Sequence, residues 1–254
     1  MSKIGITFFL LMFVGLLCYP QTNSLFEEGN ALYNDGKFAE AIEKYEAILN
    51  QDQHSAELYF NLGNAHYKLN NIGPSIYYYE KGLQLRPNDR EIQNNIAFAR
   101  NMTIDVIEPI PEVGFAKFLN SFARSMSFDG WSKLGVLYIV LFTISFLAYY
   151  FSRASMRKRA LFFTSLSFLV LVCLSVFFAY HSYNIYQKDR PAIVFAEETQ
   201  VKSEPNLRGS ISFTLHEGTK VQILESVENW KKIRLADGKT GWMIEDELKL
   251  LKDF

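Results

Sequence analysis

The chain has 254 residues, with 26 Lys+Arg against 27 Asp+Glu, so its formal net charge is −1. This balance argues against nucleic-acid binding, which is typical of strongly basic domains. Both cysteines, Cys18 and Cys173, fall in apolar stretches. The polar segments therefore lack the thiols for a disulfide framework or a thiolate metal site.

The N-terminal segment, residues 1–21, has the pattern of a secretory signal. Lys3 precedes an apolar run over residues 4–17, and polar residues follow. Small residues are missing around Tyr19 and Pro20, so a cleaved signal peptide and an uncleaved anchor both stay open. In either case we expect the following chain to be exported.

Two segments, 22–55 and 56–89, match each other at a spacing of 34 residues. The paired positions are Gly29 and Gly63, Ala31 and Ala65, Tyr33 and Tyr67, Tyr45 and Tyr79, and Leu49 and Leu83. A further helix over 90–101 follows as a cap. This pattern resembles the tetratricopeptide repeat, a helical hairpin, and it predicts an all-α module over 22–105. Two repeats and a cap are fewer than the three or so repeats that stable stacking needs. We therefore expect the module to lean on a partner, on itself or on a membrane segment.

The resemblance implies a partner-binding groove on the first helices of the repeats, which in the family receives peptides or protein tails. Its residues here are Phe26, Asn30, Tyr33, Phe60, Asn64, Tyr67, Lys68, Asn94 and Phe98. Asn30 and Asn61 fall where some family members clamp a carboxylate terminus, but Phe26 replaces the lysine of that clamp. These asparagines are either partner ligands or ordinary polar residues of a helix surface.

The charge of the same module favours one class of partner. Residues 22–105 hold seven Lys+Arg and twelve Asp+Glu, a net formal charge of −5. Such a surface either attracts a basic partner segment or only solvates the helices.

The connector over 106–130 begins with two prolines, which oppose a helix. Apolar residues then recur at helical spacing, with basic residues between them. The apolar positions are Phe115, Phe118, Leu119, Phe122 and Met126, and the basic ones are Lys117 and Arg124. We predict an amphipathic helix that lies in a membrane interface or packs under the repeat module.

Two long runs, Leu134 to Ser152 and Ala160 to Tyr180, contain no Asp, Glu, Lys or Arg. Roughly 20 apolar residues suffice to cross a bilayer, so we predict transmembrane helices over 131–151 and 160–180. Buried helices of a soluble core are the alternative, but such helices rarely lack charge on every face.

Four basic residues lie in the predicted loop between these helices, 152–159, and they determine the predicted topology. They are Arg153, Arg157, Lys158 and Arg159. Because basic loops stay in the cytoplasm, we expect a bacterial inner-membrane protein with both soluble parts in the periplasm.

The C-terminal part, 190–254, changes to short stretches rich in β-formers, separated by turns such as Asp237-Gly238. Five or six strands predict a small all-β barrel or sandwich. The runs VKSEPN, LHEGTKVQILES and NWKKIRLADGKTGWM resemble the bacterial SH3-like domain. That resemblance implies binding of peptides or cell-wall material, or protein contacts alone. Trp230 and Trp242 then belong to the barrel core or to an exposed groove.

No pattern in the sequence points to catalysis. The four histidines show neither metal spacing nor a nucleophile partner, and a Gly-rich phosphate loop is missing. We therefore expect no catalytic site, no metal and no cofactor.

The order of these modules resembles the BatE-like proteins of the Bat aerotolerance operon. The resemblance implies association with membrane-anchored von Willebrand factor A-domain proteins of the same operon, and a role in envelope or oxidative stress. Two functions stay open: a membrane scaffold or adaptor that acts through the repeat module, and a cell-wall-binding or sensing protein that acts through the SH3-like domain.

Overall fold

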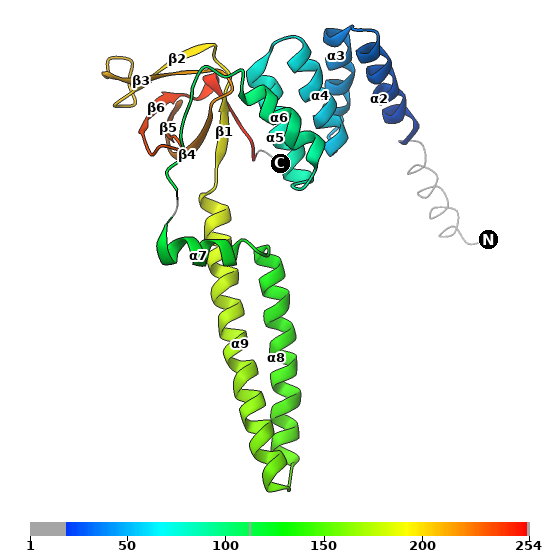
Figure 1. Cartoon of the computed structure of the whole chain (residues 1–254), viewed down its shortest axis with the longest axis vertical. Helices are drawn as coiled ribbons and strands as arrows, with labels where there is room; N and C mark the ends of the chain where they lie inside the picture. Colours follow the sequence, from blue (N-terminus) through cyan, green and yellow to red (C-terminus); the bar gives the residue numbers. More distant parts are fainter. Residues whose placement is uncertain (1–18, 112, 253–254) are drawn as a thin grey trace, which may run out of the picture. The chain divides into compact units, whose positions relative to one another are not determined.

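The computed structural model describes residues 19–111 and 113–252, which form two compact units (Figure 1). One unit combines the chain up to Pro109 with the chain from Arg190 onward, and the other is Ile110–Asp189. Most of the predicted signal segment, residues 1–18, lies outside the described residues.

Helices α2 to α6 form the helical module of the first unit. They are α2 (Tyr19–Asn34), α3 (Phe38–Leu49), α4 (Ala56–Lys68), α5 (Ile72–Leu85) and α6 (Arg90–Arg100). The Ser55 hydroxyl accepts a hydrogen bond from the Leu58 N–H at the start of α4, and the Asp89 carboxylate caps the start of α6. Between α2 and α3, Gly36 has φ +79°, which is the left-handed conformation that glycine tolerates. The predicted helical hairpins therefore form, with turns where the sequence places them.

Seven strands form one antiparallel sheet in the order β3-β2-β6-β5-β4-β1-β7. They are β1 (Pro191–Val194), β2 (Glu198–Lys202), β3 (Ile211–His216), β4 (Lys220–Val227), β5 (Trp230–Arg234), β6 (Thr240–Ile244) and β7 (Leu248–Leu250), with the short 3-10 helix η1 (Glu245–Glu247) before β7. Gly238, with φ +87°, turns the chain between β5 and β6 as its sequence predicts. The sheet has more strands than the five or six predicted, because β7 has only three residues and leaves almost no alternating pattern.

The helical module and the sheet share a hydrophobic core. Ile193 of β1 and Leu251 after β7 are fully buried in the same cluster as Tyr45, Leu62 and Ile76 of the helices. A second cluster fills the interior of the sheet. The helical module thus packs against the C-terminal domain, which was not among the three supports expected from the sequence.

The second unit holds α7 (Gly114–Ala123), α8 (Phe128–Phe151) and α9 (Ser155–Lys188). Both α8 and α9 are long and apolar enough to cross a membrane, and only 6 % and 11 % of their most apolar windows are buried within the protein. The two helices pack through small residues, with Gly135 of α8 next to Ser175 of α9.

The loop between α8 and α9 is shorter than the predicted 152–159. Because α9 begins at Ser155, the loop is Ser152–Ala154, and the basic residues Arg157, Lys158 and Arg159 lie in the first helical turns. Lys and Arg favour helix, and no Gly or Pro interrupts the chain before Pro191. For the same reason α9 continues to Lys188, beyond the predicted end at residue 180.

Candidate functional site

The same close contact joins the two helices of each repeat. A Cβ on Gly29 would lie 2.5 Å from the Tyr45 ring, and a Cβ on Gly63 would lie 2.6 Å from the Tyr79 ring. Real Cβ atoms do not approach this closely, so only glycine lets each tyrosine ring lie against the preceding helix. The 34-residue spacing of these pairs in the sequence therefore corresponds to a repeated packing contact.

The asparagines of the first helices bridge neighbouring helices. Asn30 Oδ1 accepts hydrogen bonds from the Tyr45 hydroxyl at 2.8 Å and from Asn61 Nδ2 at 2.9 Å. One repeat later, Asn64 Oδ1 accepts from the Tyr79 hydroxyl at 2.6 Å and from Asn95 Nδ2 at 2.8 Å. These bonds hold α2, α4 and α6 side by side.

Burial keeps the two tyrosines in their neutral, hydrogen-donating form. It raises the pKa of Tyr45 to about 12 and also raises the pKa of Tyr79. The oxygens of Asn30 and Asn64 are therefore occupied by internal donors. A carboxylate clamp built on Asn30 and Asn61 does not fit this geometry, since Asn61 already donates to Asn30.

A groove opens beside these bridges, on the face formed by α2, α4 and α6. It encloses about 270 Å³ and is lined by Tyr33, Asn64, Tyr67, Lys68, Tyr79, Asn95 and Phe98. Five of the nine predicted groove residues are among them. Phe98, which lines the groove, is 61 % exposed and offers an uncovered aromatic surface.

The other four predicted residues lie outside this groove. Phe60 packs on the core and against the Tyr79 ring. Phe26 lines a separate depression with Ile48 and Leu58, and Asn30 is held by its two donors. Asn94 is exposed without lining the groove, and its neighbour Asn95 lines it instead. The 34-residue spacing from Asn61 would have identified Asn95.

The C-terminal domain covers one side of helix α5, the side that faces away from the groove. The Tyr77 ring meets Phe195 edge-on at 5.5 Å, and Lys249 Nζ lies 4.6 Å from the centroid of Phe195. Gly218, with φ +83°, lies so close to the helical module that a Cβ at this position would be 2.9 Å from Thr103 and 3.0 Å from Ile76. The groove and the C-terminal domain thus occupy different surfaces of the module.

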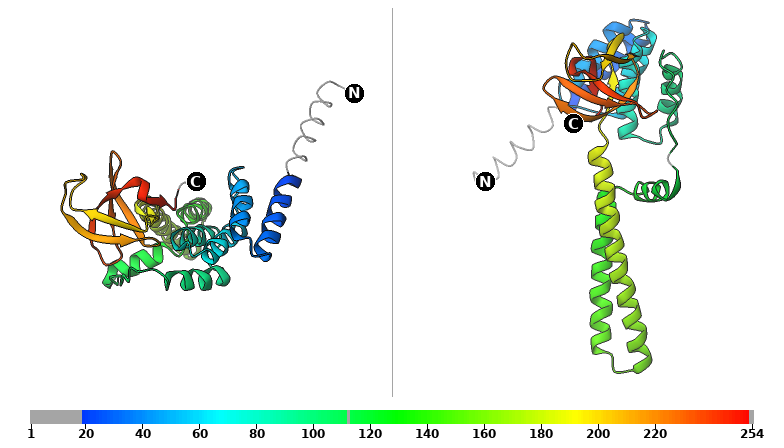
Figure 2. Two further views of the ribbon diagram at one scale, coloured as in Figure 1. Left: turned by 90° about the horizontal axis from the view of Figure 1, so that it is seen from above. Right: turned by 90° about the vertical axis from the view of Figure 1, so that its left-hand side faces the viewer.

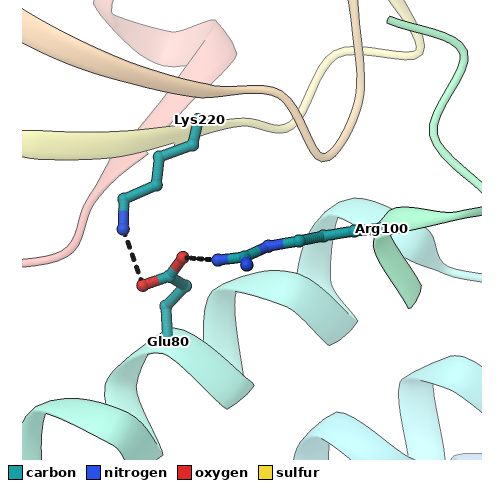
Figure 3. Close-up of polar contacts among 3 residues, drawn as sticks. All are labelled: Glu80, Arg100 and Lys220. Carbon is teal, nitrogen blue, oxygen red and sulfur yellow. Dashed lines mark hydrogen bonds and ion pairs between the residues drawn. The ribbon is translucent and has the colours of Figure 1, made fainter. Parts of the chain in front are cut away.

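A buried carboxylate links the two parts, as Figure 3 shows. Glu80 of α5 accepts hydrogen bonds from Arg100 Nη2 at 2.6 Å and from Lys220 Nζ at 2.8 Å. The Glu80 side chain is only 9 % exposed, whereas those of Arg100 and Lys220 are about half exposed. Two cations therefore compensate for removing this carboxylate from water.

A second polar contact lies next to it. The Asp105 carboxylate accepts from the His216 backbone N–H at 2.7 Å, from the Thr219 hydroxyl at 2.6 Å and from His216 Nδ1 at 2.8 Å. Burial alone would raise the Asp105 pKa, but these hydrogen bonds bring it below its ordinary value. Asp105 therefore stays charged and fixes the chain after α6 to the C-terminal domain.

His66 of α4 packs inside the module. Its ring stacks on Tyr78 at 5.3 Å, and its Nε2 is buried with no hydrogen-bond partner. Burial, with a smaller contribution from nearby Lys249, lowers the pKa of His66 from 6.5 to about 4. The imidazole is neutral at physiological pH and serves as a packing group.

Both predicted tryptophans of the C-terminal domain are largely buried. Trp230 and Trp242 are each 8 % exposed, and Lys232 Nζ lies 5.7 Å from the Trp242 ring centroid. Of the two expectations for them, burial favours the core position. A groove on this domain would have to be built from other side chains.

Three matches to family models agree with this architecture. Residues 29–70 match the model described as TPR repeat, residues 56–89 the model of the tetratricopeptide repeat, and residues 197–249 that of the bacterial SH3 domain. A comparison with curated proteins found no match. The predicted fold class is confirmed: a helical repeat region, two long apolar helices and a C-terminal antiparallel sheet matching an SH3-like domain.

The matched families describe binding rather than catalysis. Tetratricopeptide repeats suggest protein–protein interaction, bacterial SH3 domains suggest cell-wall binding, and both are typically non-catalytic modules. Within residues 19–111 and 113–252, His, Cys, Asp and Glu side chains form no cluster that could hold a metal ion.

Proposed function

We propose that this protein is an adaptor of a bacterial inner membrane, whose helical module holds a segment of a partner protein in the groove on α2, α4 and α6. The observation that carries the proposal is the groove itself. It is lined by Tyr67, Lys68 and Phe98, and it lies away from the side of α5 that the C-terminal domain covers. Aromatic side chains in such a position are frequent anchors of interfaces.

The membrane placement rests on α8 and α9. In this proposal they cross the bilayer, and Arg153, Arg157, Lys158 and Arg159 at their connection stay in the cytoplasm. All four side chains are exposed. The helical module and the C-terminal domain then lie in the periplasm. Alkaline phosphatase fused after Asn101 should be active and fused after Met156 inactive; an active fusion at Met156 would refute the topology.

The resemblance to BatE-like proteins supplies a partner to test. We propose that the groove binds the periplasmic part of a membrane-anchored von Willebrand factor A-domain protein of the same operon, in a complex for aerotolerance or envelope stress. The net negative charge of the helical module would favour a basic segment of that partner.

Co-purification with the co-expressed partner tests the groove. Tyr67→Ala combined with Phe98→Ala should abolish recovery of the partner, while Leu207→Ala, an exposed apolar residue of the C-terminal domain, should not. Asn64 is unsuitable for this test, because its oxygen holds Tyr79 and Asn95. Recovery that survives the double variant would refute the groove as the binding site.

Cell-wall binding by the C-terminal domain is the second candidate, and the match to the bacterial SH3 domain favours it. The full chain should then sediment with purified sacculi, and Leu207→Ala with Ile211→Ala on the exposed β2–β3 side should weaken sedimentation. Sedimentation that depends instead on Phe98 would argue against this candidate.

A further inference from the structure

Helix α7 carries a stripe of phenylalanine rings that is mostly uncovered. Phe115, Phe118 and Phe122 stack in sequence, with 6.3 Å between successive ring centroids. Phe115 is 73 % exposed, Phe118 62 % and Phe122 43 %. An exposed stripe of this kind marks a contact surface.

The C-terminal end of α7 is fixed to the α8–α9 hairpin. The Trp131 indole N–H donates to the Ala123 carbonyl at 3.0 Å. The Phe122 ring lies 4.8 Å from Phe178 of α9 and 5.4 Å from Trp131 of α8. Figures 1 and 2 show α7 crossing the hairpin near the end that is remote from the Ser152–Ala154 connection.

The contacts place α7 at a defined depth along the hairpin. From Phe151 back to Trp131, α8 rises about 30 Å at about 1.5 Å per residue. From Ala160 to Phe178, α9 rises about 27 Å by the same measure. The hydrocarbon core of a bilayer is about 30 Å thick. If the connection marks one surface of that core, α7 lies at the other.

The orientation of α7 about its axis is set by two contacts with α9. Phe122 meets Phe178, whereas Asn120 meets His181 at 3.0 Å, one helical turn farther from the connection. The phenylalanine edge of α7 therefore faces along the hairpin toward its apolar length. Lys117 and Arg124 lie on the opposite side of the helix at 100° per residue, and both are exposed.

We propose that α7 is an interfacial helix, with the phenylalanine stripe inserted into the acyl boundary of the bilayer and Lys117 and Arg124 in the headgroup and water layer. The occupant of the stripe is lipid, because the stripe continues from the surface of two helices of membrane length, at the level where Trp131 lies. This inference rests on the membrane placement in the proposed function. The helical module as a cover for the stripe, the alternative from the sequence, is an outcome of the test.

Single-cysteine labelling in vesicles tests the depth of each face of α7. The full chain with Cys18→Ser and Cys173→Ser would carry one nitrobenzoxadiazole-labelled cysteine at Phe118, at Lys117 or at Val170. Val170 lies midway along α9 and reports whether the hairpin has inserted. Vesicles of phosphatidylcholine and phosphatidylglycerol would contain a nitroxide-labelled lipid, and iodide would serve as the aqueous quencher.

The proposal expects the iodide quenching constant at position 118 to be roughly threefold or more below that at position 117, with stronger nitroxide quenching at 118. Equal iodide quenching at 118 and 117, with Val170 protected, would overturn the interfacial helix alone and leave the membrane adaptor standing. Low iodide quenching at 118 without nitroxide quenching would mean that the helical module or a partner protein covers the stripe, and it would overturn the interfacial helix in the same way. An iodide-accessible Val170 would instead overturn the membrane placement, and this inference with it.

Discussion

The two repeats share their inner contacts but differ on their outer surfaces. Each has the glycine–tyrosine contact and the asparagine bridge at the same spacing. Helix α3 of the first repeat buries only four residues, Ala41, Ile42, Tyr45 and Ile48, whereas α5 buries ten of its fourteen. Glu43 and Lys44 of α3 correspond to Tyr77 and Tyr78 of α5 at the 34-residue spacing. The internal contacts belong to the repeat, while the outer surface is adapted to the neighbour that covers it.

The largest effect we expect is an acid sensitivity of the second repeat that the first repeat lacks at the equivalent position. The equivalent of His66 in the first repeat is Leu32. Because the folded pKa of His66 is about 4 against an ordinary 6.5, the unfolded chain binds a proton first as the pH falls. The contribution of neutral His66 to the free energy of unfolding is complete above about pH 6.5. It falls by about 3 kcal/mol toward pH 4.

Urea unfolding of the full chain in detergent, repeated between pH 7 and pH 4, measures this loss. His66→Leu, which copies the first repeat, should flatten the dependence between pH 6.5 and pH 4. A slope unchanged in that variant would contradict the assignment to His66. Asp105, with its lowered pKa, should contribute only at still lower pH, where its carboxylate becomes protonated.

The next effect compares the two close contacts. Gly63→Leu would force the Tyr79 ring away and should destabilise the unit by about 2–3 kcal/mol. Gly29→Leu creates the same clash against Tyr45, but it should cost less, because α2 has no repeat before it in the described chain and can separate alone. Thermal unfolding followed by circular dichroism would measure both. A larger loss for Gly29→Leu would refute this view of the end of the array.

The buried ion pair should produce a smaller difference between the repeats. Glu80→Ala removes the acceptor shared by Arg100 and Lys220 and should cost about 1–2 kcal/mol. Its equivalent Glu46 is exposed and accepts one long hydrogen bond, from the Tyr78 hydroxyl at 3.3 Å, so Glu46→Ala should cost less, about 0.5 kcal/mol. Denaturant midpoints of the two variants test this, and equal midpoints would count against a structural role for Glu80.

The asparagine bridges should be the feature in which the repeats differ least. Asn30→Ala and Asn64→Ala each remove an acceptor of two hydrogen bonds, so each should cost about 1 kcal/mol. Parallel denaturation curves should agree within error. A clear difference between the two variants would show that the same hydrogen-bond geometry contributes differently to stability in the two repeats.

The sequence predicted most of what is local or periodic. The 34-residue spacing located the helical hairpins and paired the positions of the Gly–Tyr contacts, and Asp237-Gly238 located a hairpin turn. The joint between the two soluble parts was not predicted, because it depends on pairs such as Glu80 and Lys220, 140 residues apart. Such pairs leave no period in the sequence. Tyr77 and Tyr78 carried the one available signal, since they replace the charged residues of the first repeat.

The roles of the asparagines and tryptophans also depended on tertiary structure. Sequence position alone did not separate a ligand-binding Asn64 from one that accepts from Tyr79 and Asn95. In the same way, Trp242 could be assigned to a groove or to the core until the strands beside it were placed. Burial is a property of the assembled chain, and neither position carries a local pattern that determines it.

The burial of Leu251 in the helical core gives folding a late final step. A ribosome makes the chain from its N-terminus at about 5–20 residues per second. Helix α5 is complete at Leu85, so roughly 10–30 seconds pass before Leu251 is made at that rate. During this time Tyr77 and Ile76 lack the C-terminal residues that pack on them in the folded chain. The helical module is therefore synthesised with an uncovered apolar surface, and only the C-terminal end of the same chain covers it.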